Sequence, residues 1–468
     1  MTPDFAASGG APTPYIPNTE ADRAAMLARI GLPNAAALFD DLPPHWRDPA
    51  IEVPPALSEL ELMQLLRRRA QENEGARMPS FLGAGAYRRY VPAVTQALVS
   101  RPEFVTAYTP YQPEISQGTL QAAFEYQSTV CALTGMEVSN TGLYDVASAA
   151  AEGCLLAARV TSRRAVAVLE PVHPGTLDVV RTYAYGADLR VDVIHDAAAL
   201  SEEHACVLVQ QPDFLGTVVD LEAIIAAARG VGALSVVSAD PFALGMLRAP
   251  GDLGADVVVG EGRDLAIGMA YGGPSVGLFA TRDRYLRQVP GRIVGRTREL
   301  HGPDGGPPRT GYVLTLQARE QFIRRARATS NFSTGQALIA LAFTISVQAL
   351  GPRGLRDAAE FCYQAAHAAA RRLGAIPGFE VIERGPWFQE FLLRGPLAAP
   401  ELHRRLLDFG VLAGLDVSAR PEPEARDALL LCVTEATPAE DIDALESALR
   451  TISAAAGAPA SADAGARS

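Results

Sequence analysis

Short apolar runs alternate with helical patterns between about residues 80 and 300. Each run is continuously apolar rather than alternately apolar and polar, which is typical of strands covered on both faces. Helical segments separate the runs, so the pattern predicts a mainly parallel sheet with helical crossovers. The predicted strands are 165–169, 190–194, 205–210, 234–239, 255–259 and 276–280, and the predicted helices are 144–160, 174–184 and 221–230.

From Tyr15 to about Ala70 the pattern is helical. A first helix is expected over 21–31, with Asn18 or Thr19 as its cap and Gly31 as its stop. Leucines at helical spacing predict a second helix over 57–72. Both chain ends are rich in Ala, Gly, Pro and Ser, which indicates disordered tails.

A long apolar stretch, 334–351, opens the C-terminal region. It contains Thr, Gln and Ser and has a glycine at or near each end, which indicates a buried helix. The elements expected after it are a helix (355–374), two strands (379–383, 388–395), a helix (402–410), a strand (428–435) and a helix (438–452). This pattern predicts a compact α+β unit.

These patterns divide the chain into five parts. We expect tails at 1–14 and 455–468, a helical arm at 15–80, a large α/β domain at 81–332, and a small α+β domain at 333–454. A large, mainly parallel sheet domain followed by a small α+β domain is typical of fold-type-I enzymes, which use pyridoxal phosphate (PLP).

Composition excludes several classes of partner. The formal net charge of −12 argues against nucleic acid, because binding to backbone phosphates requires a basic face. No apolar run reaches the roughly 18 uninterrupted residues of a membrane span, and the N-terminus does not resemble a signal peptide. We therefore expect a cytoplasmic protein. The five cysteines and seven histidines lack metal-ligand spacing, so we expect packed thiols and no metal site.

The identity of the basic residues limits the chemistry that this chain can perform. All 41 are arginine, and the sequence contains no lysine. A genome rich in G and C accounts for this bias, but its consequence is chemical. Without a side-chain amine, the chain cannot form a Schiff base with an aldehyde cofactor through its own side chains.

Several long motifs resemble glycine decarboxylase, in particular its first subunit where the enzyme is split in two. The stretch 106–145 contains the unusual block YTPYQPEISQG, and SFLGAGAYRRY begins at Ser80. The opening YIPNTEADRAAML resembles the start of that subunit. Two later stretches, 272–297 and 312–331, resemble its other signatures. The resemblance covers nearly the whole chain apart from its tails.

The resemblance implies a heterotetramer of two first and two second subunits. In this family the second subunit, glycine dehydrogenase subunit 2, carries the PLP lysine, whereas the first has the same fold without the cofactor. The active site lies near their interface. The reaction decarboxylates glycine and transfers the aminomethyl group to lipoate on the H-protein. A non-catalytic subunit is therefore expected, with no cofactor bound covalently by this chain.

Two other functions were weighed. A scaffold or regulatory protein descended from that subunit would lack a decarboxylation role, but the intact YTPYQPEISQG block favours the subunit. An independent PLP transaminase or desulfurase is excluded by the missing lysine, unless another chain completes the chemistry.

The resemblance places four residues at degenerate cofactor positions. Asp240 follows a strand where fold-type-I enzymes keep the aspartate that pairs with the cofactor ring, although an Asp-Pro after a strand is also an ordinary turn former. Arg263 or Asp264 falls near the lysine position, and neither can form a Schiff base. Asp145 opens the helix expected to bind phosphate, where a carboxylate caps the helix and repels an anion.

The YTPYQPEISQG block provides candidates for contact with the partner. Tyr108, Tyr111, Gln112 and Glu114 lie in a proline-interrupted loop before a helix whose expected cap is Ser116 and whose expected stop is Gly135. We hypothesise that these four residues line the mouth of the partner's active site. The alternative is that they only pack the interface.

Two locally basic segments are further candidates. Arg324 and Arg325 belong to the second of them, 319–327, and could dock the H-protein or the second subunit. A solvated face would give the same pattern. Phe332 and Ser333 stand where this family usually has Ile-Cys, and the sequence offers no functional account of them.

Overall fold

The computed structural model describes residues 17–47, 52–300, 302, 306–316 and 321–457. By their contacts the residues form two units, 1–74 and 75–468. Residues 1–14, predicted as a tail, lie outside the described residues. The second predicted tail begins too early, because the last helix, α12 (Ala439–Gly457), continues past residue 455. The residues after Gly457 also lie outside the described part.

The first unit contains the two predicted helices. In α1 (Glu20–Ile30), Thr19 and Asp22 form a capping box, and Gly31 ends the helix with a φ of 86°. In α2 (Glu59–Gln71), Ser58 is the cap. Short 3-10 turns lie between them at Ala35–Phe39 and Pro44–Trp46. Neither α1 nor α2 buries a residue, so the helices are held mainly by their caps.

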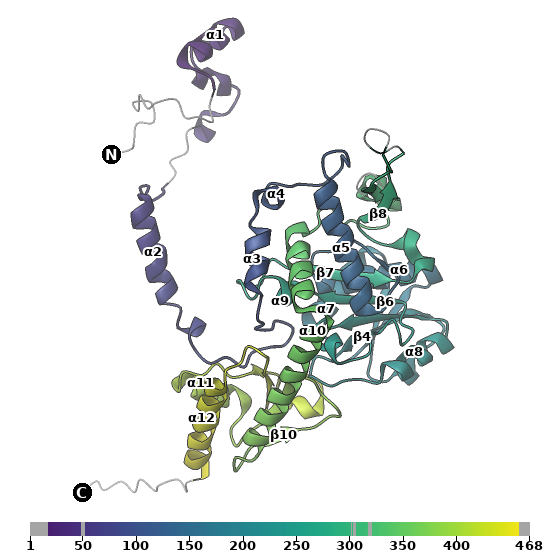
Figure 1. The fold of residues 1–468 in the computed structure, drawn as a ribbon. Coiled ribbons are helices and arrows are strands. Elements are labelled where there is room, and N and C mark those ends of the chain that lie inside the picture. Colours follow the sequence, from purple (N-terminus) through teal and green to yellow (C-terminus); the bar gives the residue numbers. More distant parts are fainter. Residues whose placement is uncertain (1–16, 48–51, 301, 303–305, 317–320, 458–468) are drawn as a thin grey trace, which may run out of the picture. The chain divides into compact units, whose positions relative to one another are not determined.

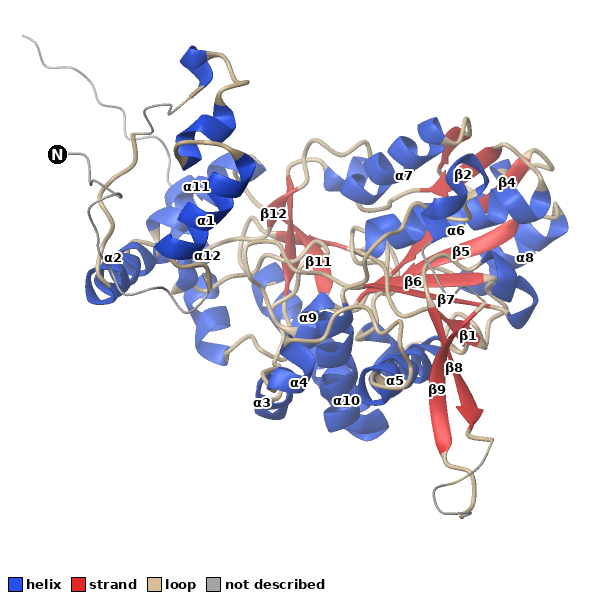
Figure 2. Ribbon diagram, turned by 90° about the horizontal axis from the view of Figure 1, so that it is seen from above, coloured by secondary structure: helices blue, strands red, loops and turns tan. Residues whose placement is uncertain are grey.

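A seven-stranded sheet forms the centre of the second unit (Figure 2). Its order is β1-β7-β6-β5-β4-β2-β3. The neighbours from β6 to β3 pair in parallel, whereas β7 is antiparallel to both of its neighbours, β6 and β1. The strands are β1 (Val138–Ser139), β2 (Ala165–Leu169), β3 (Arg190–Ile194), β4 (His204–Gln211), β5 (Leu234–Ala239), β6 (Val257–Glu261) and β7 (Gly277–Thr281). All six predicted strands are confirmed.

Helices cover both faces of this sheet, as the continuous apolar runs require. One apolar cluster joins alternate strand residues to α5, α8 and α10, and a second joins the other residues to α6 and α7. The bounds are α5 (Gln117–Thr134), α6 (Val146–Thr161), α7 (Pro174–Gly186), α8 (Leu221–Gly230) and α10 (Ala337–Gly374).

The long helix α10 connects the seven-stranded sheet to the C-terminal sheet of the second unit (Figure 1). It breaks at Gly351, whose φ is 63°, and Pro352 begins its second half. The glycine predicted to end the first helix is therefore confirmed as the break. By length and composition this helix could cross a membrane. Its first half instead packs into the core through residues such as Ile339, Phe343 and Val347, as expected of a buried helix.

The C-terminal sheet is antiparallel throughout, in the order β10-β11-β13-β12. Its strands are β10 (Glu380–Ile382), β11 (Glu390–Arg394), β12 (Leu415–Asp416) and β13 (Ala428–Cys432). The helices α11 (Ala399–Asp408) and α12 share its apolar core with the second half of α10. The compact α+β unit is as predicted. The domain boundary at 332/333 stays a prediction.

The sequence patterns missed several smaller elements. The hairpin β8 (Ile293–Arg298) and β9 (Thr310–Thr315) projects from the large sheet region (Figure 2). Two short helices, α3 (Ala93–Val99) and α4 (Pro102–Val105), precede the YTPYQPEISQG loop, and the four-residue α9 (Arg263–Ala266) follows β6. The three helices are shorter than hydrophobic periodicity resolves.

Gly277 in β7 lets the start of α6 approach the sheet. A β-carbon at this position would overlap the backbone carbonyl of Asp145, so Gly277→Ala is expected to destabilise the fold by about 1–3 kcal/mol. Urea unfolding would measure the loss. Gly118→Ala is the matched control, because a β-carbon there meets nothing within 4 Å and alanine favours the helix. Equal stability of the two variants would contradict the tight approach.

Candidate functional site

A cavity of about 410 Å³ lies at the carboxyl edge of the parallel strands. Ligand sites in open α/β sheets are usually found at this edge. The cavity brings together all four residues predicted at degenerate cofactor positions, which are Asp145, Asp240, Arg263 and Asp264. His173, which follows β2, also lines it and was not singled out from the sequence.

Asp240 fills two roles at the end of β5. Its Oδ1 accepts a hydrogen bond from the backbone N–H of Phe242 at 2.9 Å, as expected of a turn former. Its Oδ2 accepts from the Arg89 guanidinium at 3.5 Å and from the Gln389 amide at 3.3 Å. Burial raises the pKa of Asp240, and the charge of Arg89 opposes this shift. The carboxylate is therefore already paired within the chain.

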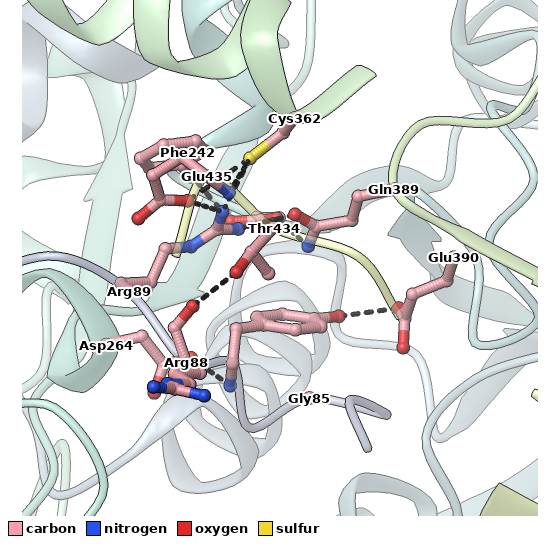
Figure 3. Close-up of polar contacts among 12 residues, drawn as sticks. Gly85, Arg88, Arg89, Phe242, Asp264, Cys362, Gln389, Glu390, Thr434 and Glu435 are labelled. Carbon is pink, nitrogen blue, oxygen red and sulfur yellow. Dashed lines mark hydrogen bonds and ion pairs between the residues drawn. The ribbon is translucent and has the colours of Figure 1, made fainter. Parts of the chain in front are cut away.

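Arg89 is the centre of a buried network (Figure 3). Its side chain is 1% exposed and donates to Glu435 Oε2 at 3.0 Å and to Gln389 Oε1 at 2.8 Å. Its guanidinium carbon lies 3.6 Å from the centre of the Phe242 ring. Because Phe242 follows the large sheet and Gln389 and Glu435 flank the small one, Arg89 ties the two sheets together. Arg89 lies in the GAGAYRRY motif, but no sequence pattern predicted its role.

Two carboxylates occupy the N-terminus of α6. Asp145 caps the helix by accepting from Ser148 N–H at 2.7 Å, so its predicted role as a cap is confirmed. Glu261 Oε2 accepts from Val146 N–H at 3.3 Å, and its Oε1 accepts from Arg263 N–H at 2.9 Å. Burial raises the pKa of Glu261 to about 7. Two of the amides that would bind an anion, those of Val146 and Ser148, are therefore already engaged.

The two residues predicted near the lysine position form an ion pair with each other. Arg263 Nε lies 2.8 Å from Asp264 Oδ1, and the Arg263 guanidinium also donates to the Gly85 carbonyl at 3.1 Å. Asp264 Oδ2 accepts from Tyr87 N–H at 3.1 Å. Both side chains line the cavity, and their correspondence to the lysine position of a catalytic subunit stays a prediction.

These residues do not fit PLP. The cofactor needs an amine for its aldehyde, a free acid for its ring nitrogen and an anion site for its phosphate. At the three positions this chain has an arginine–aspartate pair, an aspartate bound to Arg89, and a helix start filled by Asp145 and Glu261. A phosphate brought to α6 would meet two carboxylates.

Glu390 on β11 borders the same region. Its Oε1 accepts from Ala84 N–H at 2.6 Å. Its Oε2 accepts from the Tyr87 hydroxyl at 2.8 Å, the dashed line that reaches Glu390 in Figure 3. Burial raises the pKa of Glu390 to about 7, Asp240 adds to the shift, and Arg89 opposes it. The folded chain therefore binds a proton at Glu390 more tightly than the unfolded chain does.

We expect Glu390→Gln to remove one contribution to the pH dependence of the free energy of unfolding. An acid whose folded pKa is raised from 4.5 to about 7 loses stability as pH rises between those values. The stability of the variant relative to the parent should thus increase from pH 5 to pH 8, by about 3 kcal/mol at most. Urea unfolding at both pH values measures the difference, with Glu380→Gln on the exposed side of β10 as control. A pH-independent difference would contradict the buried acid.

The YTPYQPEISQG loop lies beside a second, mainly apolar cavity of about 390 Å³. Tyr108, which is 79% exposed, lines this cavity together with Arg292 and the start of α10. Arg292 also donates to the Tyr111 hydroxyl at 3.1 Å. Gln112 and Glu114 are exposed and line neither cavity. The loop therefore presents its residues outward, and their role at a partner's active site stays a prediction.

The helix after this loop begins and ends as predicted, with one difference. Ser116 occupies the cap position of α5, and Gly135 ends the helix with a φ of 69°. The side chain of Ser116 makes no capping hydrogen bond, because its backbone angles differ from the extended geometry that a capping side chain needs. Ser116 therefore occupies the cap position but does not cap the helix through its side chain.

The predicted docking arginines lie in the segment Gln321–Arg327, and both are exposed. They line different hollows: Arg324 borders one with Arg287, and Arg325 borders another with Arg159. Their role in docking stays a prediction.

The unusual Phe332 has a structural explanation. Its buried ring lies 4.7 Å from that of Tyr144, and the Tyr144 hydroxyl accepts from Ser333 N–H at 3.0 Å. Phe332 and Ser333 therefore fix the segment that leads into α10 against the residue before Asp145.

Comparison with known proteins decides the family. The sequence model of the glycine cleavage system P-protein family matches residues 13–449. The chain belongs to this family. A relative from Thermomicrobium roseum, named "Probable glycine dehydrogenase (decarboxylating) subunit 1", is 46% identical over 453 residues, which cover 94% of this chain and 100% of the relative. The resemblance inferred from the motifs is confirmed.

Solved structures agree with this assignment. The crystal structure of glycine decarboxylase (P-protein) of the glycine cleavage system, in inhibitor-bound form, matches with a TM-score of 0.84 and 41% identity, covering 94% of this chain and 99% of that chain. A sphingosine-1-phosphate lyase from Burkholderia pseudomallei shares the fold alone, with a TM-score of 0.61 and 15% identity over 88% of this chain and 97% of the lyase. The fold-type-I layout expected from the sequence is confirmed.

Proposed function

We propose that this P-protein family chain is the non-catalytic subunit of a two-subunit glycine decarboxylase. A second subunit, glycine dehydrogenase subunit 2, carries PLP on its lysine. This chain completes the active-site region at their interface, with two copies of each subunit in a cytoplasmic heterotetramer. The assembly decarboxylates glycine and transfers the aminomethyl group to the lipoate of the H-protein.

One observation carries the proposal. At the carboxyl edge of the sheet, each group that would hold PLP is replaced by a carboxylate or is bound within the chain, as Asp240 is to Arg89. A chain with this fold and this cavity requires a partner for PLP chemistry. The relatives named as subunit 1 support the existence of a subunit 2.

The exposed loop supports a role at the interface. Tyr108, Tyr111 and Ile115 are large side chains left exposed on the YTPYQPEISQG loop. Exposed aromatic residues on a loop fixed by a rigid helix are typical of contact surfaces. Covering them with the second subunit would place Gln112 and Glu114 beside the partner.

Co-expression with subunit 2 tests the proposal. Purified alone with PLP, this chain is expected to be colourless and to lack exchange of carbon dioxide with the carboxyl group of glycine. The co-purified pair is expected to be yellow and to catalyse this exchange. Subunit 2 alone is the control for its own activity. If this chain decarboxylates glycine alone, or if the pair never forms, the assignment as a subunit is wrong.

Charge reversal tests the docking arginines. If Arg324 and Arg325 dock the H-protein, R324E/R325E is expected to raise the KM for H-protein by about tenfold or more, because each lost charge pair costs on the order of 1 kcal/mol. The matched control is R404E/R405E on α11, a second exposed arginine pair. Unchanged assembly and H-protein kinetics would eliminate the docking role and leave a solvated face.

A further inference from the structure

The cavity at the sheet edge retains polar groups that the chain itself does not satisfy. Ser238 on β5 is 8% exposed and Thr176 on α7 is 4% exposed, and both line the cavity. Within the described residues, neither hydroxyl has a hydrogen-bond partner. Neither oxygen is among the fully buried side-chain atoms without a partner, so both hydroxyls are accessible from the cavity and free to bond a molecule there.

The charges around the cavity define what that occupant can be. Four carboxylates line it, from Asp145, Asp240, Glu261 and Asp264, against the two guanidinium groups of Arg89 and Arg263. Both guanidinium groups are held by acidic partners, Arg89 by Asp240 and Glu435 and Arg263 by Asp264. An anion would therefore meet an excess of negative charge, whereas a cation would be attracted.

Size and chemistry together narrow the class of ligand. The cavity volume of about 410 Å³ is much larger than the volume of one water molecule and is sufficient for a small organic molecule. An ammonium group donates three hydrogen bonds and accepts none, which suits a cavity with acceptor oxygens on Ser238, Thr176 and nearby carboxylates. The Nε2 amide group of Gln210, which also lines the cavity, offers donors to a hydroxyl of the same ligand.

We propose that the former cofactor cavity of this chain binds a small organic ammonium compound that carries a hydroxyl group and no anionic group. The cavity is then a second ligand site of the assembly, separate from the one that the partner subunit provides. The proposal depends on the side chains of this cavity and not on the glycine cleavage role.

Calorimetric titration of the full-length chain at pH 8 tests this binding. The probes are ethanolamine, the neutral analogue ethylene glycol, and the anions acetate and inorganic phosphate. Ethanolamine is expected to bind at least about tenfold more tightly than ethylene glycol, equivalent to about 1.4 kcal/mol, and neither anion is expected to bind. Working without subunit 2 avoids amine binding to PLP.

Two variants identify the site. S238A/T176V removes the unpartnered hydroxyls and is expected to weaken ethanolamine binding about tenfold. T182V on the same helix α7 is the matched control, since Thr182 does not line the cavity, and it should bind like the parent. E261Q, which removes one charge without changing shape, should also weaken binding, so the proposal does not depend on one variant folding.

Three outcomes would overturn the proposal. These are no ethanolamine binding, equal binding of ethanolamine and ethylene glycol, and binding that survives S238A/T176V and E261Q in variants that unfold at the parent's temperature. The first outcome would mean that the cavity holds only water, the second that the positive charge is not recognised, and the third that ethanolamine binds elsewhere. The exchange assay of the co-expressed pair would be unaffected, so the two proposals fail separately.

Discussion

Replacing Arg89 with alanine is expected to lower the free energy of unfolding by about 3–5 kcal/mol, because removing one partner of a buried charge pair leaves the other charge uncompensated. In the parent, the guanidinium bonds Glu435, Gln389 and Asp240 and packs on the Phe242 ring. Asp240 and Glu435 would both remain buried without a cation. Urea unfolding at pH 7 measures the loss.

The neighbouring residue supplies the control. Arg88 has a half-exposed side chain, and its nearest acidic group is Asp441 at 3.8 Å. R88A is expected to cost less than about 1 kcal/mol, the usual range for an exposed pair. Adding D240N and E435Q to R89A should recover part of the lost stability, since both buried charges are then removed. If R89A and R88A have equal stability, Arg89 does not hold the two sheets together.

The large sheet could be predicted because its information is local. The strands β2, β4, β5, β6 and β7 are mostly apolar runs, and β3 alternates polar and apolar residues. The helix break at Gly351 follows from a glycine and a proline in sequence. The hairpin β8–β9 was missed since its strands are only partly buried and carry arginine and threonine. A strand of this kind lacks the apolar run that identifies a buried one.

The site was predictable only in part, for the same reason. Four of the site residues lie next to the ends of strands or helices: Asp145, Asp240, Arg263 and Asp264. Their positions in the sequence were therefore enough to predict that they lie at one edge of the sheet. Arg89 and Glu390 were not predicted. Arg89 pairs with Glu435, 346 residues away, and Glu390 bonds Tyr87, 303 residues away. No local pattern encodes contacts at such separations.

The role of Glu261 could have been predicted from the sequence only in part. It ends the predicted strand region within GADVVVGEGRD, where an acid beside a helix start could have been noticed. Its contact with Val146 N–H depends on how α6 and β6 pack. The packing therefore turns an ordinary glutamate into the second carboxylate at the anion-binding end of α6.

A lysine alone is expected not to restore cofactor binding. R263K puts an amine at the degenerate position, but Asp145 and Glu261 still occupy the start of α6. Two like charges near a phosphate each cost several kcal/mol at short range, about 4 kcal/mol at 4 Å with an effective dielectric constant of 20. The triple variant R263K/E261Q/D145N removes both charges, and asparagine preserves the cap. We expect it to form at least about tenfold more PLP adduct than R263K.

Borohydride reduction followed by peptide mapping measures the adduct and locates it. The parent chain is the cleanest control, because without lysine its only amine is at the N-terminus, and any adduct there maps to the first peptide. E261Q/D145N without the lysine controls for the change in charge. An internal adduct on the parent would refute the absence of an amine as the reason this chain needs a partner. If R263K forms as much adduct as the triple variant, the missing lysine alone excludes the cofactor, and the carboxylates at α6 contribute nothing to its exclusion.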